Sequence, residues 1–461
     1  MKDAMNYRMR VAVVYLLGFF IDLINMFISN VAYPAISRSF HATVEQLAWV
    51  SNGYIIGLTL IIPASRWLAV RLGSKRLFLL SLSLFMVATL GAGTANSLTS
   101  LVGWRVAQGL GGGLLIPIGQ TLTYSLYPAN ERARLSAVIM LVGLLAPALS
   151  PALGGVIADG LGWRWVFFAS LPLATLTLLL AAFWLRNDET AAVKTRLDAV
   201  GLLMSCAALT LILLGLTQLG TRTERIGGAM LLLAGSALMA IYVRQSLRKT
   251  HPLLNLRLVA LPLLRTSMLI YQLVPGLFTG VSLLAMLYLQ NQLAMSATHV
   301  GELMLPWALA AFVAISLTGR QFNRLGPRPL FIAGCLINGL GIAALTLIGS
   351  GDDRLTQMTC FALMGFGSSL CSSTAQSAAF IETHDAQLGD ASALWNINRQ
   401  LSFCLGVTLM GLLFNLFSTL TEGSVTLAYR SCFVVAALSS VIPVALCLRL
   451  KDNAIVEKLA Q

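Results

Sequence analysis

Fourteen apolar stretches follow one another along this chain of 461 residues, and each is long enough to form a helix that crosses a bilayer. Such a helix needs about 20 mostly apolar residues. Charged residues make up only 11% of the chain, against about 25% in soluble domains. This excludes a water-soluble globule and a disordered chain, and it predicts an all-α membrane protein. The predicted spans are residues 11–33, 46–65, 77–97, 101–126, 135–158, 165–185, 199–219, 227–243, 264–290, 300–319, 329–349, 356–380, 392–417 and 429–448.

Lys and Arg are concentrated in alternate loops between these stretches. If the N-terminus is cytoplasmic, the inner segments hold 23 of the 31 Lys and Arg residues and the outer loops hold 6, while Arg105 and Arg399 lie within spans. Lys and Arg collect in cytoplasmic loops, so both termini are predicted to be cytoplasmic, in the cell (inner) membrane. The same bias accounts for the net charge of +13, so no nucleic-acid partner is expected.

An internal repeat supports this map. Arg71-Leu-Gly73 follows the second predicted span, and Arg324-Leu-Gly326 follows the tenth, on the same side of the membrane. An offset of eight spans fits two six-helix bundles with two extra transmembrane helices between them. Parallel repeats of this kind are typical of alternating-access transporters, which bind substrate between the halves. The predicted boundaries are 1–186 for the first bundle, 187–250 for the two extra helices and 251–461 for the second bundle.

Several motifs, in the expected order and at the expected spans, resemble the major facilitator superfamily, and within it the fourteen-helix drug:proton antiporter family. The similarity runs over nearly the whole chain. It is carried by Arg71, Gly73, Lys75 and Arg76 in the first inner loop, by 101–112 around Arg105, by Ala146-Pro147-x-x-Ser150-Pro151-x-x-Gly154-Gly155, by Trp163-Arg164-Trp165, by Asp198-x-x-Gly201, and by Gly389-Asp-Ala-Ser392 with Arg399-Gln400. The resemblance implies a major facilitator fold and the export of organic compounds in exchange for protons.

The first-loop motif departs from the family pattern at two places. Arg66 and Val70 stand where the family usually has glycine and aspartate, and Asn323 stands where an acid would fit in the second copy. In relatives this acid takes part in a charge network that latches the cytoplasmic side closed. The resemblance therefore implies gating by Arg71, Gly73 and Arg76, with a latch that is either weaker here or built from other groups.

The predicted span 135–158 carries a second gating motif. Its Pro147, Pro151, Gly154 and Gly155 recur on one helix face. Small residues allow close helix approach, and a proline removes a helical hydrogen bond. The pattern indicates either a bend that rocks or seals against the other half, or ordinary tight packing. The usual glycines at Ala146 and Ser150 are replaced by other small residues.

Asp22 lies in the middle of the first predicted span, where a carboxylate is costly and normally faces a cavity or a partner. It is the predicted proton-coupling group. Arg105 lies within reach in depth, so the two side chains form either a gated contact or a purely structural ion pair. Glu302 is the candidate for a second titrating site in the C-terminal half; its alternative is an interfacial acid that touches water.

Aromatic and amide side chains within the spans are the candidates for substrate binding, because aromatic faces attract cations and cover apolar surface. They are Phe19, Asn25, Trp49, Asn52, Tyr54, Tyr271, Gln272, Trp307, Asn398 and Arg399. The alternative for any single aromatic is contact with lipid or the interface, and for Arg399 a cation that extends to the headgroups. The lining favours amphipathic or cationic organic molecules.

The chain has no nucleotide loop of the pattern G-x-x-x-x-G-K-[ST] and no metal-ligand spacing, so no cofactor or metal is expected and transport must use a gradient. We expect a monomeric secondary exporter that is not an enzyme, with protons, a small-molecule substrate and the lipid bilayer as its partners. One alternative is a proton-coupled exporter of a single metabolite, such as an amino acid or siderophore. A membrane enzyme or receptor is the other, but the four His residues are scattered through loops and no signalling domain fits.

Overall fold

The computed structural model describes residues 2–42, 44–187, 197–219, 224–295, 297–421, 424–448 and 450, and the regular elements in these ranges are helices. Those of the N-terminal part are α1 (Lys2–Ile28), α2 (Tyr33–Phe40), α3 (Val44–Ile61), α4 (Ser65–Leu72), α5 (Ser74–Gly93), α6 (Leu98–Ser125), α7 (Ala129–Leu161), α8 (Trp163–Phe168), α9 (Leu171–Trp184), α10 (Ala199–Leu219) and α11 (Arg225–Arg248). Those of the C-terminal part are α12 (Pro262–Tyr271), α13 (Leu277–Asn291), α14 (Ala297–Glu302), α15 (Met304–Leu325), α16 (Pro327–Ala344), α17 (Arg354–Ala378), α18 (Leu388–Leu420), α19 (Val425–Ser439) and α20 (Val441–Cys447).

Twelve stretches of the described residues are long and apolar enough to cross a membrane, which makes the chain a multi-pass membrane protein. The remaining two predicted spans, 135–158 and 356–380, correspond to α7 and α17. Residues 148, 151 and 152 of α7 have side chains outside the described set, and α17 is rich in serine. The described residues thus contain twelve candidate spans, and the count of fourteen stays a prediction.

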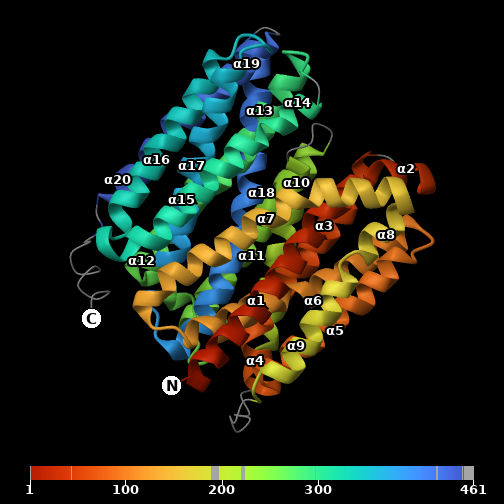
Figure 1. Cartoon of the computed structure of the whole chain (residues 1–461), viewed down its shortest axis with the longest axis vertical. Helices are drawn as coiled ribbons and strands as arrows, with labels where there is room; N and C mark the ends of the chain where they lie inside the picture. Colours follow the sequence, from red (N-terminus) through yellow and green to blue (C-terminus); the bar gives the residue numbers. More distant parts are fainter. Residues whose placement is uncertain are drawn as a thin grey trace.

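The helices of the two sequence halves occupy different parts of the molecule. In Figure 1 the red-to-yellow helices α1–α9 lie together, and the green-to-blue helices α12–α20 lie together beside them. Helix α7 packs against α1 of its own half and against α15 and α17 of the other, and α18 packs against α6. Helices α10 and α11 pack against each other, and α10 also contacts α3 and α18. The two halves therefore meet along α6, α7, α15, α17 and α18.

Glycine brings α3 and α6 into direct backbone contact. A Cβ atom added at Gly109 of α6 would lie 2.1 Å from the carbonyl oxygen of Tyr54, and one added at Gly57 of α3 would lie 2.1 Å from that of Val106. Such small-residue contacts are the usual means of tight helix packing in membranes. This close approach positions Tyr54 and Arg105 on neighbouring helices.

A π-helical segment, η4 (Gln272–Gly276), joins α12 to α13 and contains Pro275. Its backbone touches α18, because a Cβ atom added at Gly406 would lie 1.8 Å from the carbonyl oxygen of Gly276. Segments of this type frequently mark functional sites. Here the segment lies at the wall of the cavity between the halves.

Candidate functional site

Asp22 is a buried carboxylate at the junction of α1, α3 and α6. It exposes 1% of its surface, and its Oδ1 accepts a hydrogen bond from the hydroxyl of Tyr54. Helix α6 approaches closely, since a Cβ atom added at Gly112 would lie 2.5 Å from Asp22 Oδ1 and 2.9 Å from the Tyr54 hydroxyl. The acid therefore faces the interior of the N-terminal half and not lipid.

Arg105 is fully buried, and its guanidinium is surrounded by neutral acceptors. Its Nε donates to the carbonyl of Val50 at 3.0 Å, and its Nη1 donates to Gln108 Oε1 at 2.6 Å. Its Nη2 lies 3.3 Å from both the carbonyl of Asn25 and the hydroxyl of Ser29. These acceptors satisfy the buried cation without an acid.

The predicted contact between Asp22 and Arg105 is wrong for this conformation, because no ion pair joins them among the described residues. Tyr54 bridges them instead. Its ring lies 4.5 Å from Arg105 Cζ, a cation–π distance, while its hydroxyl donates to Asp22. A change in the protonation of Asp22 can therefore affect Arg105 through the side chain of Tyr54.

Gln108 completes this polar cluster and was given no role from the sequence. Its Nε2 donates to Asn25 Oδ1 at 3.0 Å and to Thr89 Oγ1 at 2.7 Å. The spacing of three residues from Arg105 places Gln108 on the same helix face, which is a signal the sequence offered. Thr89 and Ser29 lie on other segments, and no local pattern marks them.

A cavity of about 220 Å³ lies between the two halves. Its described lining residues are Phe19, Leu23, Met26, Phe27, Met140, Gly143, Leu144, Pro147, Tyr271, Pro275, Phe278, Thr279, Trp307, Ile315, Ser368, Ser369, Ser372, Arg399, Gln400 and Phe403. Four of the predicted substrate-binding residues are among them: Phe19, Tyr271, Trp307 and Arg399. Helices from both halves therefore form one apolar, aromatic site.

The other predicted binding residues lie elsewhere. Asn25 and Tyr54 belong to the polar cluster, and Trp49 exposes 41% of its surface. Gln272 donates to Asn398 Oδ1 at 2.9 Å, which ties η4 to α18 behind the cavity wall. Asn52 is partly buried, and it is not among the described lining residues of the cavity.

Arg399 of α18 is buried and lines this cavity, so its alternative as a cation reaching the headgroups is wrong. Its Cζ lies 5.5 Å from the centre of the Phe19 ring, a contact across the interface between the halves. Its Nε has no hydrogen-bond partner among the described residues. The side chain therefore places a positive charge at the cavity wall.

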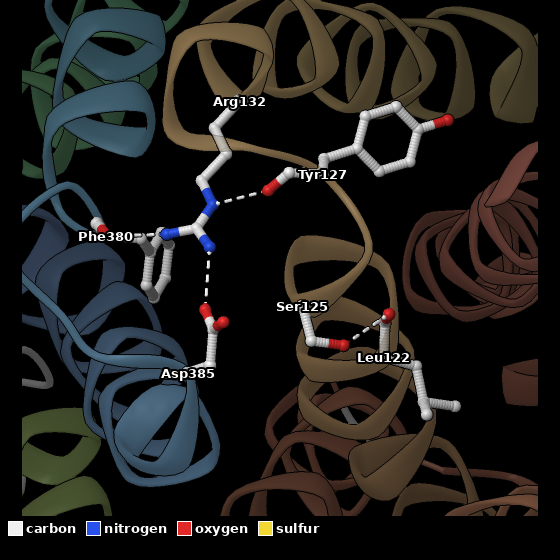
Figure 2. Close-up of polar contacts among 6 residues, drawn as sticks. All are labelled: Leu122, Ser125, Tyr127, Arg132, Phe380 and Asp385. Atoms are coloured by element: carbon white, nitrogen blue, oxygen red, sulfur yellow. Dashed lines mark hydrogen bonds and ion pairs between the residues drawn. The ribbon is translucent and has the colours of Figure 1, made fainter. Parts of the chain in front are cut away.

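Two ion pairs join the halves at the end of the molecule that holds the predicted inner loops. Arg66 of α4 pairs with Asp390, whose side chain is fully buried in α18. Arg132 of α7 donates to Asp385 Oδ1 at 3.0 Å and to the carbonyl of Phe380 at 3.2 Å. Figure 2 shows Arg132 directed toward both acceptors. Arg66, which stands where the family usually has glycine, supplies the cation of one of these pairs.

The residues of the first inner loop that were predicted to act in gating differ in conformation and contacts. Gly73 turns the chain between α4 and α5 with φ 83°, and Gly326 does so between α15 and α16 with φ 76°, as the repeat predicts. This region of φ favours glycine. Arg71 stacks on Trp67 at 5.4 Å, and Arg76 is exposed. Neither arginine forms an ion pair with a described residue.

The residues of the gating motif in α7 differ in their surroundings. Pro147 lines the cavity, and Gly154 is buried. A Cβ atom added at Gly155 would have no neighbour within 4 Å, so the predicted close packing there is absent in this conformation. The side chain of Pro151 lies outside the described residues.

Glu302 lies at the end of α14, where its Oε2 accepts a hydrogen bond from Arg354 Nη2 at 3.0 Å. Both side chains are at least half exposed. Glu302 is therefore an exposed acid that pairs with an exposed arginine.

Comparisons with known proteins agree with this geometry. The family model described as Major Facilitator Superfamily matches residues 15–407 and 268–458. The chain is 31% identical over 402 residues to the drug efflux pump JefA of Mycobacterium tuberculosis, covering 86% of this chain and 78% of that protein. It is 31% identical over 412 residues to the multidrug resistance protein B homolog of the same species, covering 88% and 76%.

Among solved structures, the human organic anion transporter MFSD10 aligns with a TM-score of 0.67 at 16% identity, covering 95% of this chain and 99% of that one. At this identity the likeness concerns the fold alone. The extent of the family match and the identity to the two relatives establish the assignment: the chain belongs to the Major Facilitator Superfamily.

Proposed function

We propose that this protein is a secondary exporter that moves amphipathic organic compounds out of the cell in exchange for protons, by alternating access. The proposal includes a location in the cell (inner) membrane, both termini in the cytoplasm and a monomeric protein. The drug efflux pumps to which the chain is similar support export of organic compounds. The lining of the cavity supports an amphipathic substrate, because aromatic and aliphatic side chains form most of its wall.

One observation carries the coupling part of the proposal: α1 places Asp22 in the buried polar cluster and Phe19 in the cavity wall. The two residues are three apart, so they occupy neighbouring positions on the same helix. Protonation of Asp22 weakens the hydrogen bond from Tyr54, because the hydroxyl then loses a charged acceptor. A shift of α1 or α3 in response reaches the cavity directly.

The two ion pairs at the predicted inner end support alternating access. Arg66 with Asp390, and Arg132 with Asp385, each join a helix of the first half to the chain of the second half. Opening the cavity toward that end requires both pairs to separate. Without a nucleotide site the energy comes from a gradient, and one charge that crosses 100 mV supplies about 2.3 kcal/mol.

We further propose that α7 and α17 also cross the membrane, which gives fourteen spans. At about 1.5 Å per residue, α7 is about 50 Å long and α17 about 37 Å, enough to cross. Both pack along other long helices, α7 against α1 and α15, and α17 against α15 and α16. Residues 1–186 and 251–461 then form the two six-helix bundles, and 187–250 provides the two extra helices.

The test is transport into or out of proteoliposomes with an imposed pH gradient, using wild type and Asp22→Asn. We expect the variant to insert and to lose gradient-driven transport. Asp159→Asn is the matched control, since Asp159 is an exposed acid of α7, and it should transport like wild type. Unchanged gradient-driven transport by Asp22→Asn rejects the coupling role. If the protein exports only one compound from a panel of unrelated compounds, the result favours the alternative of an exporter for a single metabolite.

A further inference from the structure

The cavity between the halves has a single formal charge in its described lining, and that charge is positive. Of its lining residues only Arg399 is ionised at neutral pH, and no Asp or Glu is among them. Phe19, Phe278 and Trp307 belong to the aromatic part of the wall, and Phe278 stacks on Trp307 with ring centres 6.1 Å apart. The described wall is therefore apolar around one cation.

Arg399 differs from Arg105, another buried arginine, in what surrounds it. Every guanidinium nitrogen of Arg105 donates a hydrogen bond to a described acceptor. Arg399 exposes 9% of its surface, its Nε has no partner, and its described neighbour is the face of Phe19. A buried cation left in this state is costly unless a partner arrives.

No described acid neutralises the Arg399 guanidinium by direct contact. Asp22 accepts its hydrogen bond from Tyr54 within the polar cluster, and no ion pair joins it to Arg399 in the described part of the chain. Arg399 therefore brings its charge to the cavity wall with no ion-pair partner among the described residues. A guanidinium offers five N–H donors in a fixed fork, which matches the two oxygens of a carboxylate.

We propose that the cavity takes an amphipathic organic anion, whose carboxylate or sulfonate binds the guanidinium of Arg399 while its apolar body lies against the aromatic wall. This inference rests on the proposed function and specifies its substrate class. An organic anion is proposed here in place of the cationic substrate expected from the sequence. The positive charge of Arg399 would repel an organic cation in the cavity. The cavity provides no described acid to offset that repulsion.

The test compares three ligands that share one apolar body and differ in charge: 1-naphthaleneacetate, 1-naphthaleneacetamide and 1-naphthylmethylammonium. Binding to the purified full-length protein is measured by equilibrium dialysis of radiolabelled ligand. We expect the anion to bind at least 10-fold more tightly than the cation, with the neutral amide between them. Equal or tighter binding of the cation by wild type overturns the proposal without any variant.

Arg399→Gln then removes the charge and leaves a shorter, neutral polar side chain. We expect it to weaken binding of the anion at least 10-fold and to change binding of the amide by less than 2-fold. Arg399→Lys retains the charge but not the fork, and it should lie between wild type and Arg399→Gln. Arg354→Gln, which removes an exposed arginine paired with Glu302, is the matched control and should leave all three affinities unchanged. Equal weakening of all three ligands by Arg399→Gln overturns the assignment, because it indicates a packing role.

Transport of 1-naphthaleneacetate in proteoliposomes separates this inference from the proposed function. Anion-selective binding that depends on Arg399, together with no response of transport to a pH gradient, contradicts proton exchange and leaves the substrate class standing. Gradient-driven transport of the cation and not of the anion contradicts the substrate class and leaves the exchange mechanism standing.

Discussion

The hydroxyl of Tyr54 donates a hydrogen bond to the carboxylate of Asp22, and this bond joins α3 to the predicted coupling group on α1. The same ring lies 4.5 Å from the guanidinium of Arg105. One neutral side chain therefore contacts both Asp22 and Arg105. This arrangement separates the acid from the cation, and it explains how each is satisfied without an ion pair.

Tyr54→Phe is predicted to reduce proton-coupled transport while the protein remains folded. A hydrogen bond to a charged group contributes about 1.5–3 kcal/mol, so its loss should change the coupled rate by about 10-fold or more. The measurement is gradient-driven transport in proteoliposomes. Tyr15→Phe is the control, because it removes another buried tyrosine hydroxyl of this half that bonds to no described acid. Equal effects of the two substitutions would show that the Asp22 contact is not what matters.

The ion pair between Arg66 and Asp390 is predicted to stabilise the observed conformation. Arg66→Gln, Asp390→Asn and the double variant form a cycle whose coupling free energy should be about 1–2 kcal/mol, since the acid is buried and the arginine is not. The readout is the unfolding midpoint in detergent. The same cycle at the exposed pair Arg354 and Glu302 should give less than about 1 kcal/mol. Additive effects at the first pair would contradict its role as a latch.

Gly109→Ala is predicted to destabilise the N-terminal half strongly. The new methyl group would lie 2.1 Å from the carbonyl oxygen of Tyr54, so α3 and α6 must separate. Overpacking of this kind costs about 1–3 kcal/mol or more. Gly155→Ala is the matched control, since the added methyl group meets nothing within 4 Å, and a helical alanine is favoured over glycine. The measurement is thermal unfolding in detergent, in which only Gly109→Ala should have a lower midpoint than wild type.

Asp198→Asn is predicted to reduce stability at neutral pH and not in acid. Burial raises the pKa of Asp198, but Lys249 Nζ at 2.6 Å and the backbone N–H of Gly201 at 2.9 Å stabilise the charged form more, so the pKa is lowered. The resulting stabilisation is present above the unfolded pKa of about 4 and is lost as the pH falls through the folded pKa.

The measurement is the unfolding midpoint of wild type and Asp198→Asn between pH 7 and pH 3. The difference should be below about 1 kcal/mol at pH 7, because solvent screens the partly exposed Lys249, and it should shrink toward pH 3. Asp159→Asn, at an exposed acid outside the described ion pairs, should show no such trend. A difference that persists unchanged at pH 3 would contradict the electrostatic origin.

Local patterns in the sequence predicted the elements of this molecule well. Apolar runs of the right length marked the helices, because hydropathy and length alone decide whether a segment crosses a bilayer. The repeat at Gly73 and Gly326 marked two equivalent turns with positive φ, because only glycine adopts that backbone easily. Motifs of the family identified the superfamily that the comparisons establish. Of the residues predicted to bind substrate, Phe19, Tyr271, Trp307 and Arg399 line the cavity.

Tertiary structure decided which of these side chains meet. Arg66 and Asp390 are 324 positions apart and form one ion pair, and no local pattern in either segment specifies the other. The sequence placed Arg105 at the right depth for Asp22, but depth does not fix rotation, and Tyr54 occupies the space between them. Hydropathy is a property of a single segment, so the sequence alone marks where most of the long apolar helices run. The partner of a buried charge depends on how several helices rotate and pack against one another, which only the folded structure defines.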